Sequence, residues 1–201
     1  FSQSEKGSLQ SDMISASRRQ GMMAVAIEGL PALLKEIEAG HPVIVFENLG
    51  VSWMPQWHYA IVFGYNLQEK KILMHSGPDA FKEEDMADFE LSWRLGQYWG
   101  LVILPPDELS ATADELTHAS AAAALESLGR TEEAQTSYRA ILNRWPNSLP
   151  AYVGLGNIFY QQKLYRESVS YLQKAVRVSP ESAAALHNLE LAKMALDATQ
   201  R

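Results

Sequence analysis

A repeat of 34 residues in the C-terminal half constrains this chain more than any other feature. Trp145-Pro146-Asn147 and Ser179-Pro180-Glu181 lie 34 positions apart. The same offset relates further pairs of positions: Ala134 and Ser168, Tyr138 and Leu172, Ile141 and Ala175, Tyr152 and Leu186, and Leu155 and Leu189. Small and large apolar residues at fixed places in such a period predict a helical repeat. Each pair of antiparallel helices then buries its apolar face only by stacking on the next pair.

The pattern resembles the tetratricopeptide repeat. The second copy has Leu155-Gly156, Phe159, Ala175 and Pro180 where that repeat places Leu-Gly, Tyr, Ala and Pro. The first copy keeps Gly129, Ala134, Tyr138 and Pro146, and has Ala121-Ala122 in place of Leu-Gly. The resemblance implies repeats over 115–148 and 149–182, built from helices over 115–128, 131–144, 149–162 and 165–178, and a capping helix over 183–198.

The composition changes near Pro105-Pro106. Residues 1–105 contain four of the five tryptophans and eight alanines, whereas residues 106–201 contain seventeen alanines. Because consecutive prolines continue neither a strand ladder nor a helix, we place the domain boundary there. The sequence thus predicts one domain over 1–106, a linker over 107–113, and the repeats over 114–201.

The first domain alternates helical and strand-like segments. Leu33, Leu34 and Ile37 share one face of a helix predicted over 30–39, which ends at Gly40. Residues 57–65 and 71–76 resemble a hairpin around the turn 66–69. Further segments are predicted as a helix over 9–20 and as strands over 23–27, 42–47 and 98–104. This order predicts an α+β domain with an antiparallel sheet.

Charge and apolar content exclude several classes of protein. The formal net charge of −7 argues against the basic surface that neutralises phosphates, so we predict no nucleic-acid partner. No apolar run approaches about 18 residues, so no transmembrane segment is predicted. The chain has no cysteine, which excludes disulfides, zinc–thiolate sites and a cysteine nucleophile within this sequence.

The segment from Trp53 to Tyr65 is the densest in residues that carry chemistry. His58 opens a predicted strand that continues as an apolar run and ends in Gly-Tyr; Gly40-His41-Pro42-Val43-Ile44 lies upstream and Leu73-Met74-His75-Ser76-Gly77 downstream. This order resembles the bacteriocin-processing (double-glycine leader) cysteine peptidase family, which has a papain-like fold. Phe89, Trp93 and Trp99 resemble the closing segment of that family. The resemblance covers about residues 20–105 and implies a papain-like peptidase half-domain, followed here by an all-α repeat array.

The resemblance implies catalysis by a cysteine thiolate paired with an imidazolium. His58 takes the place of the general base. The orienting carboxylate of the family should lie near the end of the next strand, where this chain has Met74, His75 and Ser76. We therefore take His75 and Asp79 as the remaining candidates for the catalytic site.

The nucleophile is missing from this sequence, which has no cysteine and begins at Phe1 rather than Met. In the family, the cysteine opens a helix upstream of everything matched here. Either the nucleophile lies in a stretch before Phe1, or the protein has lost catalysis. In both cases we expect these 201 residues alone not to hydrolyse peptides.

Other candidate residues have a structural alternative. Trp53 and Trp57 either line a substrate groove or supply packing area. The histidines at 41, 58 and 75 lack metal-ligand spacing, so the sequence predicts no metal site and no cofactor. The acidic run Glu83-Glu84-Asp85 is predicted to be a solvated helix start.

The repeats offer a second candidate site, on the concave face lined by the first helix of each pair. Asn157 and Tyr160 fall on that face, as do His187 and Asn188 on the last helix. In peptide-binding arrays of this family, asparagines at such places hydrogen-bond the main chain or terminal carboxylate of a ligand, and here Val153 replaces the lysine of a carboxylate clamp. The sequence predicts a peptide or protein groove without that clamp. Alternatively, both asparagines only tie adjacent repeats together.

Together these features predict a cysteine-peptidase-like protein that hydrolyses peptide bonds, with His58 as base and with repeats that bind substrate or a partner. The alternative is a non-catalytic adaptor in which a degenerate peptidase fold binds a peptide or protein. The missing carboxylate at 74–76 favours the adaptor, whereas the strand that begins near His58 and the 34-residue period favour the peptidase. The family resemblance points to a bacterial protein of the periplasm or cell envelope.

Overall fold

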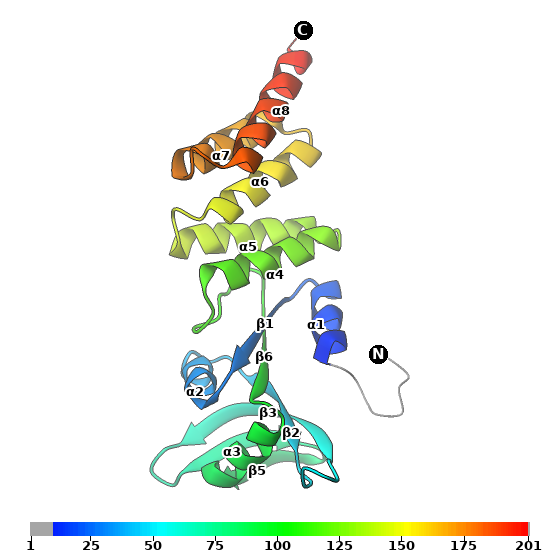
Figure 1. Cartoon of the computed structure of the whole chain (residues 1–201), viewed down its shortest axis with the longest axis vertical. Helices are drawn as coiled ribbons and strands as arrows, with labels where there is room; N and C mark the ends of the chain where they lie inside the picture. Colours follow the sequence, from blue (N-terminus) through cyan, green and yellow to red (C-terminus); the bar gives the residue numbers. More distant parts are fainter. Residues whose placement is uncertain (1–9, 201) are drawn as a thin grey trace. The chain divides into compact units, whose positions relative to one another are not determined.

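The computed structural model describes residues 10–200, which form two compact units (Figure 1). The sheet unit consists mainly of Met23–Leu104, and the helical unit consists mainly of Asp114 and the residues after it. The sheet unit also includes Ser110–Ala113. The last strand ends at Leu104, next to the predicted boundary at Pro105-Pro106.

The sheet unit contains a six-stranded sheet in which every neighbouring pair of strands is antiparallel. Its strand order is β1-β6-β2-β3-β4-β5. The elements are α1 (Gln10–Arg19), β1 (Met23–Glu28), α2 (Leu30–Glu38), β2 (Val43–Asn48), β3 (Trp57–Asn66), β4 (Lys71–Ser76), β5 (Asp79–Asp85), α3 (Met86–Leu95) and β6 (Trp99–Leu104). The α+β class with an antiparallel sheet is therefore as predicted.

The acidic run Glu83-Glu84-Asp85 is not a helix start, which corrects the prediction. It forms the end of β5, and only Asp85 belongs to a helix terminus, because its side chain accepts a hydrogen bond from the backbone N–H of Ala87 at 3.0 Å. Strand β5 was missed as an element, whereas helix α3 begins directly after the acidic run. Four of the seven residues of β5 are acidic, a composition that strands usually avoid.

The two faces of the sheet differ in what covers them. Strands β2, β3 and β4 send a layer of fully or almost fully buried apolar side chains to one face: Val43, Val45, Ala60, Val62, Ile72 and Met74. Helix α3 packs on this face with Phe89 and Trp93, and neither side chain is exposed. The opposite face carries half-buried aromatic rings, which include Phe46, Tyr59 and Phe63.

Glu36, near the C-terminal end of α2, anchors a segment that follows the last strand. Its carboxylate is fully buried and accepts hydrogen bonds from the Ser110 hydroxyl (2.6 Å), the backbone N–H groups of Ala111 and Thr112 (3.1 and 2.8 Å), and the Thr112 hydroxyl. The Nδ1 atom of His41 adds a hydrogen bond of 2.7 Å to the same carboxylate. Burial alone would raise the pKa of Glu36, but these donors outweigh burial and hold the pKa below its ordinary value. The end of the predicted linker is therefore fixed to α2.

The helical unit contains α4 (Glu115–Ser127), α5 (Thr131–Arg144), α6 (Leu149–Gln161), α7 (Tyr165–Val178) and α8 (Ala183–Thr199). The 34-residue period also relates two helix N-caps: Ser148 caps α6, and Ser182, one period later, caps α8. Each serine hydroxyl accepts a hydrogen bond at 3.3 Å from the backbone N–H three residues on. Within residues 10–200, no helix combines the length and the apolar character that crossing a membrane requires.

Two glycines of α6 let neighbouring helices approach closely. A Cβ atom built on Gly154 would lie 2.3 Å from the ring of Tyr138 in α5, and one on Gly156 would lie 2.5 Å from Leu172 in α7. Such a contact forces a buried neighbour to move, since both Tyr138 and Leu172 are almost fully buried. The Leu-Gly pair of the repeat is thus a packing requirement between α6 and α7.

The Glu36 anchor predicts an acid-dependent loss of stability. Because the pKa of Glu36 is lowered on folding, its contribution is complete above the unfolded-state value of about 4.3 and disappears as the pH falls through the folded-state value. We expect Glu36→Gln to lower the free energy of unfolding by about 3 kcal/mol at pH 7 and by much less at pH 3. Urea titrations across that range measure the difference. Glu38→Gln, an exposed acid on the same helix, is the control and should change little; an equal loss at both pH values for Glu36→Gln would contradict the anchor.

Candidate functional site

His58 lies at the start of β3, where the ends of β2 and β4 also meet. Its Nε2 atom shares a hydrogen bond of 2.9 Å with the hydroxyl of Ser76, the last residue of β4. The register pairs Ser76 with Ala60, so Ser76 and His58 lie on the face of the sheet that α3 covers. A hydroxyl therefore occupies the place where the family resemblance implied a carboxylate, and Ser76 is a site residue that the sequence analysis did not select.

The other ring nitrogen of His58, Nδ1, makes no hydrogen bond to residues 10–200. The side chain is half-buried. Gly77 lies beside the ring, and a Cβ atom on Gly77 would be 4.0 Å from Cε1 of His58. One nitrogen is thus held while the other is available, which is the arrangement a general base requires.

Glu47 lies directly across from His58 on β2, and the pairing of the two residues places both side chains on the same face. The carboxylate is 1% exposed and accepts a hydrogen bond of 2.6 Å from the Ser92 hydroxyl of α3. Burial raises the pKa of Glu47 and the nearby charge of Glu84 adds to the effect, whereas Ser92 and Lys82 oppose it. Sequence reasoning missed this residue because nothing in the pattern of a short apolar strand marks its last acid as buried.

His75 lies on the other face of the sheet. Its register partner is Ile61, whereas Ser76 pairs with Ala60, so consecutive residues of β4 point in opposite directions. The His75 ring stacks on Phe63 at a centroid distance of 4.5 Å, and its Nδ1 atom shares a hydrogen bond with the carbonyl of Ala80. The structure does not bring His75 to His58.

Asp79 lies one strand beyond Ser76, since the β4–β5 register pairs these two residues. Asp79 is exposed and makes no hydrogen bond to His58 within the described chain. Asp79 therefore lies one strand further from His58 than Ser76 does.

The two tryptophans near His58 lie in different settings. The ring of Trp57 stacks on that of Phe46 at a centroid distance of 5.0 Å, and Trp57 lies on the face of the sheet opposite to His58. Trp53 is 80% exposed in the loop between β2 and β3. Asn48 shapes this loop, because its side-chain oxygen accepts hydrogen bonds from the backbone N–H groups of Gly50 (2.9 Å) and Gln56 (2.8 Å). Neither tryptophan is buried in the core.

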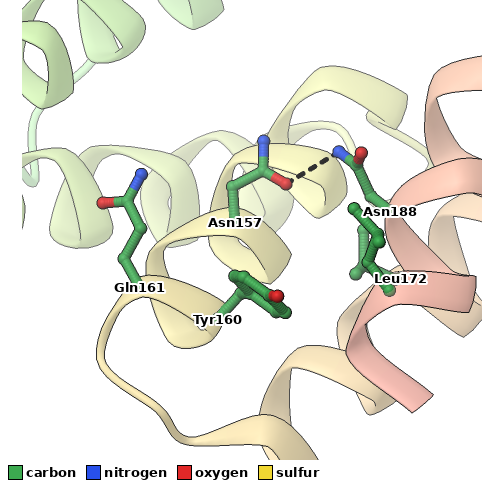
Figure 2. A pocket seen from close by; sticks show the side chains of 6 residues that line it. Asn157, Tyr160, Gln161, Leu172 and Asn188 are labelled. Carbon is green, nitrogen blue, oxygen red and sulfur yellow. Dashed lines mark hydrogen bonds between the residues drawn. The ribbon is translucent and has the colours of Figure 1, made fainter. Parts of the chain in front are cut away.

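The helical unit contains a pocket of about 260 Å³ between α6, α7 and α8 (Figure 2). It is lined by Asn157, Tyr160, Gln161, Leu172, Asn188 and Leu191. The Asn188 side-chain N–H donates a hydrogen bond of 2.9 Å to the side-chain oxygen of Asn157. Three of the four residues predicted for the groove thus line one pocket, and none of the lining residues is charged.

His187 is exposed on α8 and does not line this pocket. Sequence reasoning also missed Gln161, Leu172 and Leu191, although the phase of Gln161, one helical turn after Asn157, would have indicated it. Figure 2 shows that the free amide nitrogen of Asn157 and the free amide oxygen of Asn188 both point away from Leu172.

No group of three or more metal-ligating side chains suited to a metal ion occurs among residues 10–200. The buried carboxylate of Glu36 is surrounded by hydroxyl and backbone donors, and His41 is the one metal-ligating side chain beside it among the described contacts.

The tetratricopeptide repeat family matches the chain twice, over residues 120–148 and residues 149–182. These residues are tetratricopeptide repeats, which confirms the prediction made from the 34-residue period. Among solved structures, the chain is similar to the crystal structure of the peptidase domain of Streptococcus ComA, a bi-functional ABC transporter involved in a quorum-sensing pathway. That likeness has a TM-score of 0.41 and 16% sequence identity, and covers 51% of this chain and 70% of that chain. A search of curated proteins found no match.

The buried acid opposite His58 predicts an effect of pH on stability. Because the pKa of Glu47 is raised on folding, ionisation of this carboxyl disfavours the folded state, and its favourable contribution at low pH is lost as the pH rises through the folded-state value. We expect Glu47→Gln to raise the midpoint of thermal unfolding at pH 8, since Gln still accepts the Ser92 hydrogen bond, and to have little effect below about pH 4. Thermal melts monitored by circular dichroism test this. Glu83→Gln, an exposed acid of the same sheet, is the control; a uniform change at all pH values would contradict the assignment.

Proposed function

We propose that the protein is a cysteine-peptidase-like protein in which His58 is the general base and the repeats hold a peptide segment of the substrate or of a partner. The observation that carries the proposal is the hydrogen bonding of the His58 ring. Nε2 is held by the Ser76 hydroxyl at 2.9 Å, and Nδ1 remains available for a proton. An oriented imidazole with one available nitrogen is what activation of a thiol requires.

In the proposed reaction, Nδ1 of His58 takes the proton of a thiol, and the resulting thiolate attacks the carbonyl carbon of the peptide bond. The imidazolium then returns the proton to the leaving amine, and water hydrolyses the acyl-enzyme. The thiol has to come from outside these 201 residues, which contain no cysteine. Ser76 orients the ring but, as a neutral hydroxyl, stabilises the imidazolium less than a carboxylate would.

The pocket of the repeats supports the binding part of the proposal. The bond between Asn157 and Asn188 uses one amide donor and one amide acceptor, which leaves the nitrogen of Asn157 and the oxygen of Asn188 for a ligand. One donor and one acceptor, at either end of this hydrogen-bonded pair, can bind the C=O and N–H groups of a peptide main chain. Leu172 and Leu191 supply apolar surface, so an uncharged segment with an apolar side chain fits the pocket.

A non-catalytic adaptor is the second candidate. The specific observation in its favour is the hydroxyl of Ser76 at the place of a triad carboxylate. In that case the same pocket at Asn157 and Asn188 would carry the function, and the sheet unit would serve as a second binding module.

Thiol reactivity distinguishes the two candidates. In the intact protein, a thiol-directed covalent probe should label one cysteine, and His58→Ala should abolish the labelling because the thiol loses its base. Ser76→Ala should slow labelling about tenfold or more, since it leaves the ring unoriented. Intact-protein mass spectrometry measures both rates.

His75→Ala is the matched control, because it removes an imidazole from the opposite face of the same strands. It should leave labelling unchanged. Absence of any reactive cysteine in the intact protein, or labelling that is equal in His58→Ala and His75→Ala, would rule out the peptidase and leave the adaptor.

The groove predicts selective binding of uncharged peptides. On an array of extended peptides, the chain should retain leucine-containing neutral sequences over counterparts that carry Lys or Glu at the same places. Asn157→Ala and Asn188→Ala should each weaken binding about tenfold, the value of roughly one hydrogen bond lost in a partly dry pocket.

Asn147→Ala, an exposed asparagine in the turn before α6, is the control and should bind as the unchanged chain does. If both groove variants instead lost thermal stability and kept their binding, the asparagine pair would only tie α6 to α8.

A further inference from the structure

Strand β5 forms one edge of the sheet. The strand order gives it β4 as its only strand neighbour, and its residues make no backbone hydrogen bond to a loop or helix on the other side within the described chain. An edge with free backbone N–H and C=O groups is a template for a further strand. Native proteins protect such edges by covering or bulging them, or by adding charge to them.

Phe81, in the middle of β5, is 81% exposed, the highest value of any large apolar side chain among the described residues of the sheet unit. Its ring makes edge contacts with Phe63 and His75 at centroid distances of 5.9 and 5.4 Å. It therefore extends the half-buried aromatic face of the sheet to the edge. An exposed phenylalanine at an edge increases the tendency of that edge to pair, which is the opposite of protection.

Acidic residues precede and follow Phe81 along β5. Asp79, Glu83, Glu84 and Asp85 give β5 four negative charges against the one positive charge of Lys82. Glu84 is paired with Lys82 at 2.9 Å, and Asp85 lies 3.9 Å from Lys71. Glu83 is exposed, forms no ion pair within residues 10–200, and lies two residues from Phe81 on the same face.

We propose that the edge of β5 binds an extended, basic segment of a partner protein by strand addition. The main chain of the segment pairs with β5, an apolar side chain covers Phe81, and a Lys or Arg two residues away meets Glu83. This combination selects a partner strand with a basic residue at position i and an apolar residue at i+2 or i−2. The net negative charge of the edge favours such a partner and disfavours pairing of β5 with a second copy of itself.

The proposal is independent of the proposed peptidase activity and of the pocket in the repeats. Its features lie on the aromatic face and at the edge, whereas His58 and Ser76 lie on the other face. Failure of one proposal therefore does not decide the other.

The test uses the full chain and a blocked peptide, acetyl-Thr-Lys-Thr-Ile-Thr-Lys-Thr-amide, with a counterpart in which both lysines are glutamates. In ¹H–¹⁵N correlation spectra, the lysine peptide should shift the amide signals of residues 79–85 and slow their hydrogen exchange. The glutamate peptide should do neither. Glu83→Lys should weaken binding of the lysine peptide roughly fivefold and improve that of the glutamate peptide.

Phe81→Ala should also weaken binding, because it removes the apolar contact while leaving the edge backbone in place. Glu38→Lys makes the same charge change at an exposed position of α2 and should have no effect. Shifts confined to residues outside β5, equal binding of the two peptides, or concentration-dependent shifts of β5 without peptide would each overturn the proposal; the last would identify a second copy as the occupant.

Discussion

The alternation of side chains across the antiparallel sheet is the constraint on which the candidate site depends. A shift of one residue along β4 exchanges Ser76 for His75, and the two point to opposite faces. The register with β3 therefore decides that a hydroxyl, and not a second imidazole, contacts His58. The same alternation puts Glu47 with His58 and Trp57 against Phe46, so residues that are neighbours in sequence belong to different environments.

The fold was predictable from the sequence where a residue pattern recurs at a fixed period or extends over many residues. The starts of α6 and α8 are examples, because Ser148 and Ser182 lie one 34-residue period apart and each caps a helix. Strand β5 was not predictable in this way, since its acidic composition resembles the first turn of a helix and its strand state comes from pairing with β4. Ser76 and Glu36 were missed for a related reason: their roles come from partners 18 and 74 residues away in the chain.

The two buried glutamates Glu36 and Glu47 show how hydrogen-bond donors determine whether the pKa of a buried carboxyl group falls or rises. Glu36 has hydroxyl, backbone and imidazole partners, and their combined effect exceeds the cost of burial, so its pKa falls. Glu47 has a single hydroxyl partner and a like charge nearby, so burial prevails and its pKa rises. The first group is a structural anchor that requires its charge. The second lies across from His58, and there a carboxyl that resists ionisation limits how much negative charge the site offers to an imidazolium.

This difference bears on what His58 does. A triad carboxylate both orients the imidazole and places a negative charge beside it. The neutral Ser76 hydroxyl only orients the ring, and burial makes the ionisation of Glu47 less favourable. In the proposed peptidase, catalysis would then depend on the partner thiol and on how closely the substrate is held. A hydroxyl partner for His58 and a pocket in the repeats of the same chain are therefore both compatible with the proposed peptidase.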